Sequence, residues 1–463
     1  MKLRELLHNI VDVNFDVEIK GVTCNPKRVK EGYLFVCVSE EGEKCMSDIK
    51  ASAIIANFGV IPARNAGIHI FHLNPQEIYS EIVSRFYQFK QPKYVAAVTG
   101  TNGKTSVVEF CRQIWQNAGY NAASIGTLGT CINDDRKGNS DNLTTPGADD
   151  LYSTLRDINN KNVEHLALEA SSHGIDQYRT HGLKLSAAAF INFSQDHLDY
   201  HKNLSEYLEA KKRLFFEVLP EGKTAVLNSD IDEYNGLLKI AEKRGNKIIA
   251  YGKTGSDITL LKQTPTPNGQ HLTIKIDNQI YNTFFPVLGK FQAYNLLCAI
   301  GISGLNCREI CVDKLVSPPG RMEKVNPFAF VDYAHTPNAL KQALLSLKWH
   351  FNKKIVLVFG CGGNRDKTKR SEMGKIAQMY ADRVIITDDN PRDEDPAKIR
   401  HDILSDALEI GDRKKAIEKG IDIAYNEDMI LLIAGKGHEK SQIIGNQTFE
   451  FSDVEVIKSK IMP

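Results

Sequence analysis

A glycine-rich loop between an expected strand and an expected helix constrains the fold of this chain more than any other feature. Residues 94–98 form an apolar run of strand length, and apolar residues at 107, 108, 110 and 114 mark one face of a following helix. Glycines between them let backbone N–H groups converge on phosphate oxygens, and the helix N-terminus adds its positive end. Lys104 can neutralise phosphate charge, and Thr105 can hold Mg²⁺. The predicted nucleotide contacts in this loop are Gly100, Thr101, Asn102, Gly103, Lys104, Thr105 and Ser106.

The loop is shorter than the full phosphate-loop pattern, which would need a glycine where Val98 stands. A plain strand–turn–helix corner is the alternative, but the Lys-Thr pair at the start of the helix favours ATP binding.

Strand-length apolar runs alternate with helix-length segments through the rest of the chain. Such runs occupy 165–168, 187–192, 224–227 and 247–251, and again 329–331, 355–359, 384–387 and 430–434. Alternation of this kind predicts mainly parallel sheets with helices on both faces. A Ser317-Pro-Pro-Gly-Arg321 segment interrupts regular structure between the two groups. At 463 residues we expect three α/β domains, at 1–92, 93–317 and 318–463, the third resembling a dinucleotide-type Rossmann sheet.

Composition excludes several function classes. The formal net charge of +1 gives no general affinity for nucleic acid or anionic membranes. The N-terminal segment lacks the apolar core of a signal peptide, and no run approaches the ~18 apolar residues of a membrane span. Nine scattered cysteines without a CxxC pair fit free thiols in a reducing compartment. We therefore expect a cytoplasmic enzyme that is not inserted in a membrane.

A series of motifs resembles those of the Mur ligase family, and they occur in the family's order across residues 95–463. The loop itself, T-G-T-N-G-K-T, is similar to that of Mur ligases and folylpolyglutamate synthetases. The other motifs are Leu143-Thr-Thr-Pro146, Leu168-Glu-Ala-Ser-Ser-His173, Asn192-Phe-Ser-Gln-Asp-His-Leu-Asp-Tyr-His201, Gly320-Arg-Met-Glu323, Asp332-Tyr-Ala-His-Thr-Pro337, Gly360-Cys-Gly-Gly-Asn-Arg-Asp366, Asp389-Asn-Pro-Arg392 and Gly435-Lys-Gly-His-Glu439.

The resemblance implies an ATP-dependent amide ligase that joins an amino acid to UDP-MurNAc-L-Ala-D-Glu through an acyl phosphate. It implies that Thr105, Glu169 and His197 hold Mg²⁺, and that Lys211 is carboxylated by CO₂ to an anionic carbamate. Lys104, Glu169, His197 and Lys211 are then the predicted catalytic residues. From the residues alone, His197, which lies between Asp196 and Asp199, could be a surface or core histidine, and Lys211 an exposed helical lysine.

Further residues match the family's contacts with its nucleotide and its UDP-linked precursor. Asn295, Arg321 and Asp332 match contacts with ATP, the first of them with adenine. Hydroxyl, amide and guanidinium groups suit sugar, phosphate and carboxylate oxygens, although Ser and Thr serve equally well in turns and helix caps. The predicted precursor contacts are Thr144, Thr145, Ser171, Gln177 and Arg179.

The third domain resembles the branch of the family that binds meso-diaminopimelate. Diaminopimelate carries one more carboxylate than lysine, and a planar guanidinium such as that of Arg392 suits a carboxylate. Glu439 would accept a hydrogen bond from the distal ammonium group. The alternative for Arg392 is a solvated position beside Asp393, Glu394 and Asp395. The predicted amino-acid contacts are Arg365, Asp389, Asn390, Pro391, Arg392, Gly435 and Glu439.

The N-terminal domain, which binds the uridine nucleotide in the family, departs from the family pattern. Gly32-Tyr-Leu-Phe-Val36 matches, but Asn25-Pro-Lys-Arg-Val29 and the segment 41–47 replace two expected motifs. No uridine contact is assigned here. We expect a monomer. Two alternatives stay open: a related ligase that adds L-lysine or glutamate, and a phosphate-loop ATPase that makes no bond.

Overall fold

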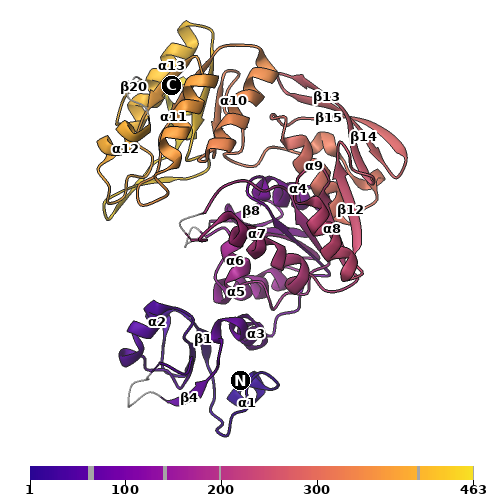
Figure 1. Cartoon of the computed structure of the whole chain (residues 1–463), viewed down its shortest axis with the longest axis vertical. Coiled ribbons are helices and arrows are strands. Elements are labelled where there is room, and N and C mark those ends of the chain that lie inside the picture. The colour runs from indigo at the N-terminus through magenta and orange to yellow at the C-terminus, as the bar shows by residue number, and fades with distance from the viewer. Residues whose placement is uncertain (61–66, 139–142, 198–199, 404–406, 462–463) are drawn as a thin grey trace.

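The chain forms three successive α/β domains along the longest axis of the molecule in the computed structural model (Figure 1). The structure describes residues 1–60, 67–138, 143–197, 200–403 and 407–461. The principal sheet of each domain lies within one of the ranges 1–92, 93–317 and 318–463, whose boundaries stay predictions. The expected α/β fold with a mainly parallel central sheet is confirmed.

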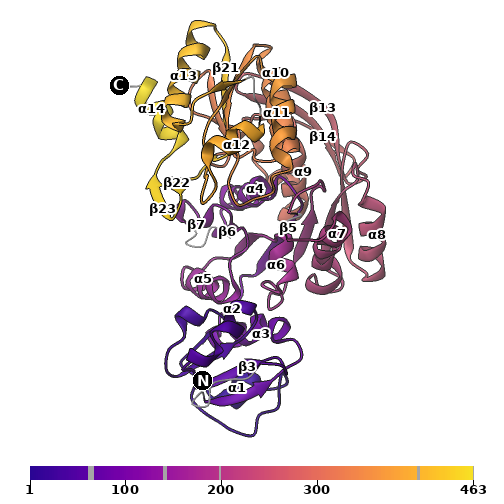
Figure 2. The ribbon, with the colours of Figure 1, turned by 60° about the vertical axis from the view of Figure 1, so that its left-hand side comes forward.

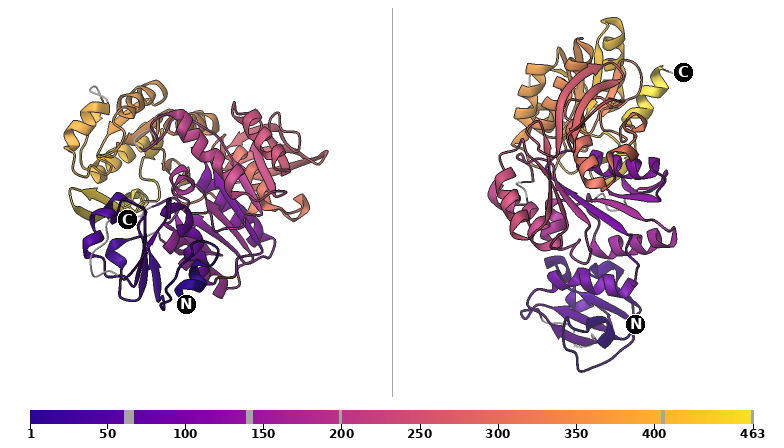
Figure 3. Two further views of the ribbon diagram at one scale, coloured as in Figure 1. Left: turned by 60° about the horizontal axis from the view of Figure 1, so that its bottom comes forward. Right: turned by 90° about the vertical axis from the view of Figure 1, so that its right-hand side faces the viewer.

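The N-terminal domain is a parallel sheet in the order β1-β2-β3-β4, at one end of the molecule in the right-hand view of Figure 3. Its main helix, α3, packs on α5 of the central domain, and buried residues of both domains form one continuous core. The elements are β1 (Gly21–Thr23), β2 (Tyr33–Val36), β3 (Ala53–Ala56), β4 (Ile68–Phe71), α1 (Leu3–Leu7), α2 (Glu40–Lys44) and α3 (Pro75–Tyr87).

The central domain is built on a sheet of order β15-β14-β13-β12-β11-β10-β5-β9-β6-β7-β8. Its strands are β5 (Tyr94–Thr99), β6 (Ala122–Gly126), β7 (Gly129–Ile132), β8 (Asp135–Lys137), β9 (His165–Glu169), β10 (Ala187–Phe190), β11 (Thr224–Asn228), β12 (Lys247–Gly252), β13 (Ile258–Thr266), β14 (Gly269–Ile276) and β15 (Gln279–Phe285). Its helices are α4 (Lys104–Asn117), α5 (Ala148–Asn160), α6 (Ser172–Asp176), α7 (Leu204–Arg213), α8 (Tyr234–Lys243) and α9 (Gln292–Ser303).

Strand β5 lies in the middle of this sheet and is buried on both faces. Val95 and Ala97 enter the core that is shared with the N-terminal domain, whereas Ala96 and Val98 pack under α4 and α9. This two-sided burial explains why residues 94–98 form a continuous apolar run. Strands β5, β9 and β10 are parallel neighbours, so their carboxyl ends meet at one edge, where the site lies.

The third domain has a sheet of order β16-β17-β21-β18-β19-β20, parallel except at β16. The small pair β22-β23 lies on the side that faces the central domain (Figure 2). Its elements are β16 (Glu323–Lys324), β17 (Ala329–Asp332), β18 (Ile355–Phe359), β19 (Arg383–Ile386), β20 (Leu408–Glu409), β21 (Ile430–Ala434), β22 (Ser441–Ile444), β23 (Gln447–Glu450), α10 (Pro337–Phe351), α11 (Lys369–Tyr380), α12 (Pro396–Ile403), α13 (Arg413–Asn426) and α14 (Asp453–Ile461).

All nine cysteines are free thiols, as their spacing predicts. Within the described ranges, no single helix has the length and apolar character to cross a membrane. One pair, α9 with residues 307–314, reaches that threshold by length and composition only and is bent by 116°.

Candidate active site

The phosphate loop leaves β5 at Gly100 and enters α4 at Gly103, both with positive φ, of +150° and +90°. A Cβ on Gly103 would lie 2.5 Å from Oδ1 of Asn295, so only glycine fits between the loop and α9. The structure therefore brings Asn295 against the loop, and the contact of Asn295 with adenine stays a prediction. Gln292, also on α9, donates to the Ser106 hydroxyl at 3.3 Å.

Hydrogen bonds attach the loop to the segment that follows β10. The Thr101 hydroxyl donates to the carbonyl of Ser194 at 3.1 Å, and the Asn102 N–H donates to the Asn192 side chain at 2.9 Å. A third bond, from the Thr101 N–H to the Asn192 carbonyl at 3.0 Å, adds to this attachment.

Two lysines converge on one carbonyl oxygen of the loop. Lys104 Nζ donates to the carbonyls of Gly100 and Thr101, both at 2.9 Å, and Lys211 Nζ donates to the same Gly100 carbonyl at 2.9 Å. Lys211 is only 1% exposed and also lies 4.4 Å from the Tyr207 ring. Among the described residues neither lysine forms an ion pair. Burial lowers the pKa of both ammonium groups, and the Lys104 charge lowers that of Lys211 further.

Glu169 ends β9 as a buried carboxylate beside the loop. It accepts hydrogen bonds from the N–H and the hydroxyl of Thr127, at 2.8 and 3.1 Å. A Cβ on Gly126 would lie 2.2 Å from its Oε1, so a glycine is needed for the carboxylate to reach this place. Burial raises the pKa of Glu169, and the Lys104 charge opposes that rise. A buried carboxylate of this kind suits a bound cation.

His197 follows β10 in a left-handed backbone conformation, with φ +53°. Its Nε2 lies 3.6 Å from Oδ2 of Asp196, and its ring lies 4.9 Å from that of His173. Burial lowers the pKa of His197 to about 4 although Asp196 opposes the shift, so the imidazole is neutral at pH 7, the form that can bind a metal. Asp199 lies outside the described residues.

Thr105, Glu169 and His197 are the predicted ligands of Mg²⁺. Within the ranges that the structure describes, no group of three or more His, Cys, Asp or Glu side chains is arranged to hold a metal ion. Mg²⁺ typically takes one or two protein ligands and completes its shell with phosphate oxygens and water. Thr105 and Glu169 offer oxygen donors of that kind, whereas His197 offers a nitrogen, and the binding of Mg²⁺ by all three stays a prediction.

Arg321 reaches from the third domain to the loop. Its Nη2 donates to the Thr105 hydroxyl at 3.0 Å, and its guanidinium lies 4.4 Å from the Tyr333 ring. Its Nη1 is buried without a hydrogen-bond partner among the described residues. An unpartnered buried donor beside the loop fits an incoming phosphate oxygen. Asp332 accepts from the N–H groups of Met322 and Ala334 at 2.6 and 2.8 Å, and burial raises the pKa of Asp332 to about 6.

The predicted precursor contacts form one connected network next to Glu169. Thr144 accepts from the Thr127 hydroxyl at 3.3 Å, and the Thr145 hydroxyl donates to the Glu169 carbonyl at 2.8 Å. Ser171 caps α6 by accepting from the Gly174 N–H. Thr145 and Ser171 therefore stabilise a turn and a helix cap, the alternative roles that the sequence allowed for them.

Arg179 extends this network toward the N-terminal domain. It donates to the Thr145 carbonyl at 2.6 Å and to the Gln177 side chain at 3.1 and 2.5 Å. Burial raises the pKa of the Cys24 thiol, which follows β1, to about 12, and the positive charge of Arg179 opposes that rise. The precursor roles of these residues stay predictions.

The predicted amino-acid contacts lie together at the carboxyl ends of β19 and β21. Asn390 bonds to Glu439 at 3.0 Å, and Asp389 lies 2.7 Å from where a Cβ on Gly435 would be. The Pro391 carbonyl lies so close to Gly363 that a side chain there would collide with it.

Arg392 has φ +51° and donates from Nη1 to the carbonyls of Gly363 and Asn390, at 2.9 and 3.4 Å. Arg365 is exposed, and its charge acts on Arg392. Burial and this neighbouring charge lower the pKa of Arg392. A bound carboxylate would relieve the repulsion between the two guanidinium groups, and this role of Arg392 and Arg365 stays a prediction.

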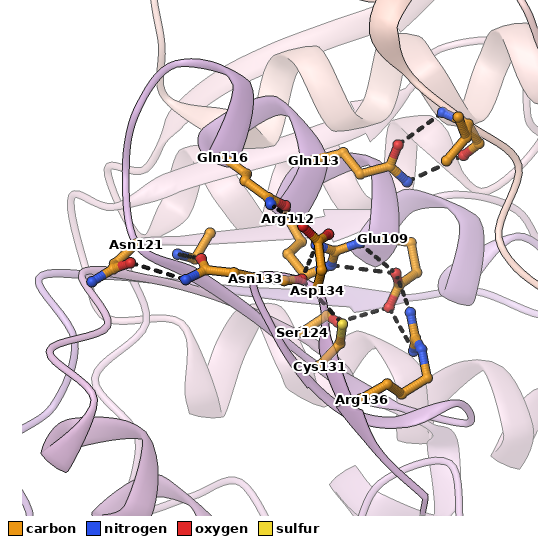
Figure 4. A network of polar contacts seen from close by, with 12 residues as sticks. Glu109, Arg112, Gln113, Gln116, Asn121, Ser124, Cys131, Asn133, Asp134 and Arg136 are labelled. Carbon is orange, nitrogen blue, oxygen red and sulfur yellow. Dashed lines mark hydrogen bonds and ion pairs between the residues drawn. The ribbon is translucent and has the colours of Figure 1, made fainter.

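A buried polar network on α4 was not predicted from the sequence (Figure 4). The Glu109 carboxylate accepts from Arg136 on β8 at 2.7 Å and from Ser124 on β6 at 2.7 Å, and Arg112 lies 3.4 Å away. The network ties the phosphate-loop helix to the hairpin that leads to Thr144 and Thr145. The only sequence signal was a pair of opposite charges, Glu109 and Arg112, three residues apart in the expected helix.

Gln113, one turn further along α4, holds the linker to the third domain. Its side chain donates to the Val316 carbonyl at 3.1 Å and accepts from the Val316 N–H at 2.8 Å. Together with the Arg321–Thr105 bond, this connects the linker and the start of the third domain to α4. No sequence pattern pointed to Gln113.

Comparison with known proteins agrees with this geometry. Family models for the "Mur ligase middle domain" and the "Mur ligase, glutamate ligase domain" match residues 98–303 and 320–437. A protein of Anaplasma marginale (strain St. Maries), named UDP-N-acetylmuramoyl-L-alanyl-D-glutamate--2,6-diaminopimelate ligase, is 45% identical over 453 residues, which cover 95% of this chain and 96% of that protein. A protein of Caulobacter vibrioides with the same name is 40% identical over 464 residues, 95% of this chain and 94% of that protein.

A solved structure of a ligase with this name has a TM-score of 0.71 and 31% sequence identity, and the match covers 100% of this chain and 98% of that one. Near-complete coverage at such identities, with both family models matched in order, shows that this chain belongs to the Mur ligase family.

Proposed function

We propose that this chain is an ATP-dependent amide ligase that adds meso-2,6-diaminopimelate to UDP-MurNAc-L-Ala-D-Glu. One observation carries the proposal: Arg321 of the third domain bonds to Thr105 of the phosphate loop, so the domain with the amino-acid contacts is joined directly to the nucleotide site. The names of relatives that match over nearly the whole chain support the same reaction.

The first step joins a carboxylate of the precursor to the γ-phosphate of ATP, giving an acyl phosphate and ADP. Its main obstacle is electrostatic, because a carboxylate must approach a triphosphate. Lys104 and the free Nη1 of Arg321 neutralise phosphate oxygens, and Asn295 orients the adenine. Thr105, Glu169 and His197 would hold Mg²⁺, which when bound supplies further positive charge at the triphosphate.

Lys211 becomes carboxylated in this proposal. Two buried ammonium groups that share the Gly100 carbonyl repel each other, so Lys211 gives up its proton most easily. The neutral amine then forms an N–C bond with CO₂, and a proton leaves to water. The resulting carbamate is an anion, which turns the repulsion with Lys104 into attraction and gives the metal-binding region a further oxygen ligand.

In the second step, an amino group of diaminopimelate attacks the acyl carbon, and phosphate leaves from the tetrahedral intermediate. Arg392, supported by Arg365, binds the distal carboxylate, and Glu439 accepts from the distal ammonium group. A lysine-adding ligase would have no use for a guanidinium held in this position, which disfavours that alternative. The protein acts as a cytoplasmic monomer on soluble substrates.

Phosphate release from the purified protein tests this proposal. UDP-MurNAc-L-Ala-D-Glu is supplied with diaminopimelate, L-lysine, L-glutamate or no amino acid. Turnover that needs both the precursor and diaminopimelate supports it. Turnover with L-lysine or L-glutamate would point to a different ligase, and turnover without an amino acid to a phosphate-loop ATPase that makes no bond.

A further inference from the structure

Lys436 is a fully buried lysine inside the amino-acid site, and no role in the proposed reaction has been assigned to it. It stands between Gly435 and Gly437 after β21, and its side chain is 0% exposed. Its Nζ donates to Glu439 Oε2 at 2.8 Å and to Asn390 Oδ1 at 2.9 Å. A lysine charge is seldom fully buried, and it must be paired when it is.

These contacts fix the orientation of the Asn390 amide. Its Oδ1 accepts from Lys436 Nζ and also from the Ile443 N–H at 3.0 Å, so the oxygen must face these two donors. The amide nitrogen then points the other way and donates to Glu439 Oε2 at 3.0 Å. Lys436 therefore acts on Glu439 twice, directly and through Asn390.

The Glu439 carboxylate is held by one oxygen as a result. Within the described part of the chain, both hydrogen bonds that its side chain accepts end on Oε2. With Oε2 held by two donors, the carboxylate has a set orientation, and Oε1 is the oxygen left for a substrate donor. A carboxylate without these donors could rotate and would lose its direction.

We propose that Lys436 is a positioning residue that aims Glu439 Oε1 at the distal ammonium group of the incoming amino acid. The inference rests on the proposed function, because it takes diaminopimelate as the substrate. It assigns recognition of the distal amine to the unit Lys436–Asn390–Glu439, separately from recognition of the distal carboxylate by Arg392. A purely structural buried ion pair would instead affect stability and all amino-acid substrates alike.

The experiment compares diaminopimelate with 2-aminopimelate, which keeps both carboxylates but lacks the distal amine. In wild type, kcat/KM for diaminopimelate should exceed that for 2-aminopimelate by roughly tenfold or more, the scale of one hydrogen bond to a charged group. In Lys436→Met this preference should fall to within about threefold, chiefly through a higher KM for diaminopimelate. The KM for ATP and the rate with 2-aminopimelate should change little.

Two further variants keep the test decisive. Lys440→Met removes an exposed lysine four residues away and should leave the preference intact. The double variant Lys436→Met/Glu439→Gln leaves no half-buried carboxylate without its cation, so it should fold more readily than the single variant. It should show no more loss of preference than Glu439→Gln alone, because Lys436 acts through Glu439.

The results for wild type and for Lys436→Met distinguish failure of the proposed function from failure of this inference. If wild type does not use diaminopimelate, the proposed function fails. If wild type prefers diaminopimelate and Lys436→Met keeps that preference, or loses rate equally with both amino acids, Lys436 is structural and only this inference is overturned.

Discussion

The nucleotide site and the amino-acid site differ in whether their buried lysines are paired with a carboxylate. At the phosphate loop, Lys104 and Lys211 share a carbonyl oxygen and form no ion pair with the described residues. In the third domain, the buried Lys436 is paired with Glu439. In the proposed function, the first site would gain its balancing charge from ATP and from the Lys211 carbamate, whereas the second is paired before a substrate binds. Substitutions should accordingly abolish chemistry at the first site and alter selectivity at the second.

Lys104→Ala should have the largest effect. Removing the loop's cation should lower kcat/KM for ligation by at least about a thousandfold, because the charge of Lys104 is lost and Arg321 alone of the two proposed cations is left at the triphosphate. Phosphate release and thermal unfolding measure activity and folding. Lys93→Ala, which removes a lysine whose side chain is 80% exposed, is the control and should remain active. A folded Lys104→Ala protein with near-normal turnover would remove the loop from the mechanism.

Lys211→Ala should follow, with a loss of roughly a hundredfold in kcat, because the carbamate oxygens are missing. Small carboxylates such as formate or acetate should restore part of the activity, and bicarbonate should not. The matched control is Lys212→Ala, whose lysine is paired with Glu209 on the helix surface. An active wild-type enzyme whose Lys211 is shown by mass spectrometry or a crystal structure to be an unmodified amine would contradict the carbamate.

A change in pH should act on the nucleotide site through Asp332. Burial raises the pKa of Asp332 to about 6, so the folded protein takes up a proton there as pH falls through 6, well above the ordinary range. This uptake stabilises the fold as pH falls toward the ordinary carboxyl pKa, and that contribution is lost as pH rises through 6. If the ionised form contacts ATP, KM for ATP should rise about tenfold per pH unit below 6.

The comparison protein for this pH series is Asp332→Asn, whose amide does not titrate and whose KM should show no such rise. No step is expected near pH 6.5 from His197, because burial lowers its pKa to about 4. A flat KM from pH 5 to 8 in wild type would exclude Asp332 from nucleotide binding.

Gln113→Ala should have the smallest effect, because it breaks only the attachment of the linker. Loss of two hydrogen bonds to Val316 should lower the free energy of unfolding by about 1–3 kcal/mol. KM for ATP and for diaminopimelate should stay within about threefold of wild type. Denaturant unfolding measures the first, with Asn117→Ala at the exposed end of α4 as control. If Gln113→Ala raises either KM by more than about threefold, the contact between the linker and α4 affects substrate binding and does not only stabilise the fold.

Sequence reasoning predicted the elements that are buried on both faces. The runs at 355–359 and 430–434 match β18 and β21 to the residue, since parallel central strands are apolar throughout. It missed the antiparallel strands β13 to β15, whose residues are half exposed and often polar. It also missed the π-helical turn Leu214–Val218, which ends the helix that was expected over 204–215.

The candidate site divides in the same way. Motif positions such as Gly103 and Glu169 could be found because the chemistry demands a residue type at a fixed spacing. Contacts between distant segments, such as Gln113 with Val316, have no local pattern. Lys436 stood inside a recognised motif, yet only its burial and its two partners distinguish it from a solvated lysine.

The most direct test of the proposed substrate compares kcat/KM for meso-diaminopimelate and L-lysine in wild type and Arg392→Ala. The guanidinium of Arg392 is half-buried, and a charge-assisted hydrogen bond from it to the distal carboxylate contributes about 1.5–3 kcal/mol, so wild type should prefer diaminopimelate by roughly ten- to a hundredfold. Arg392→Ala should lose diaminopimelate activity steeply while weak lysine activity changes little, and Arg383→Ala, which removes an exposed arginine, should behave as wild type. If wild type uses both amino acids equally well, or the variant loses both activities equally, Arg392 does not select the substrate. The proposal that this ligase is specific for diaminopimelate through Arg392 is then wrong.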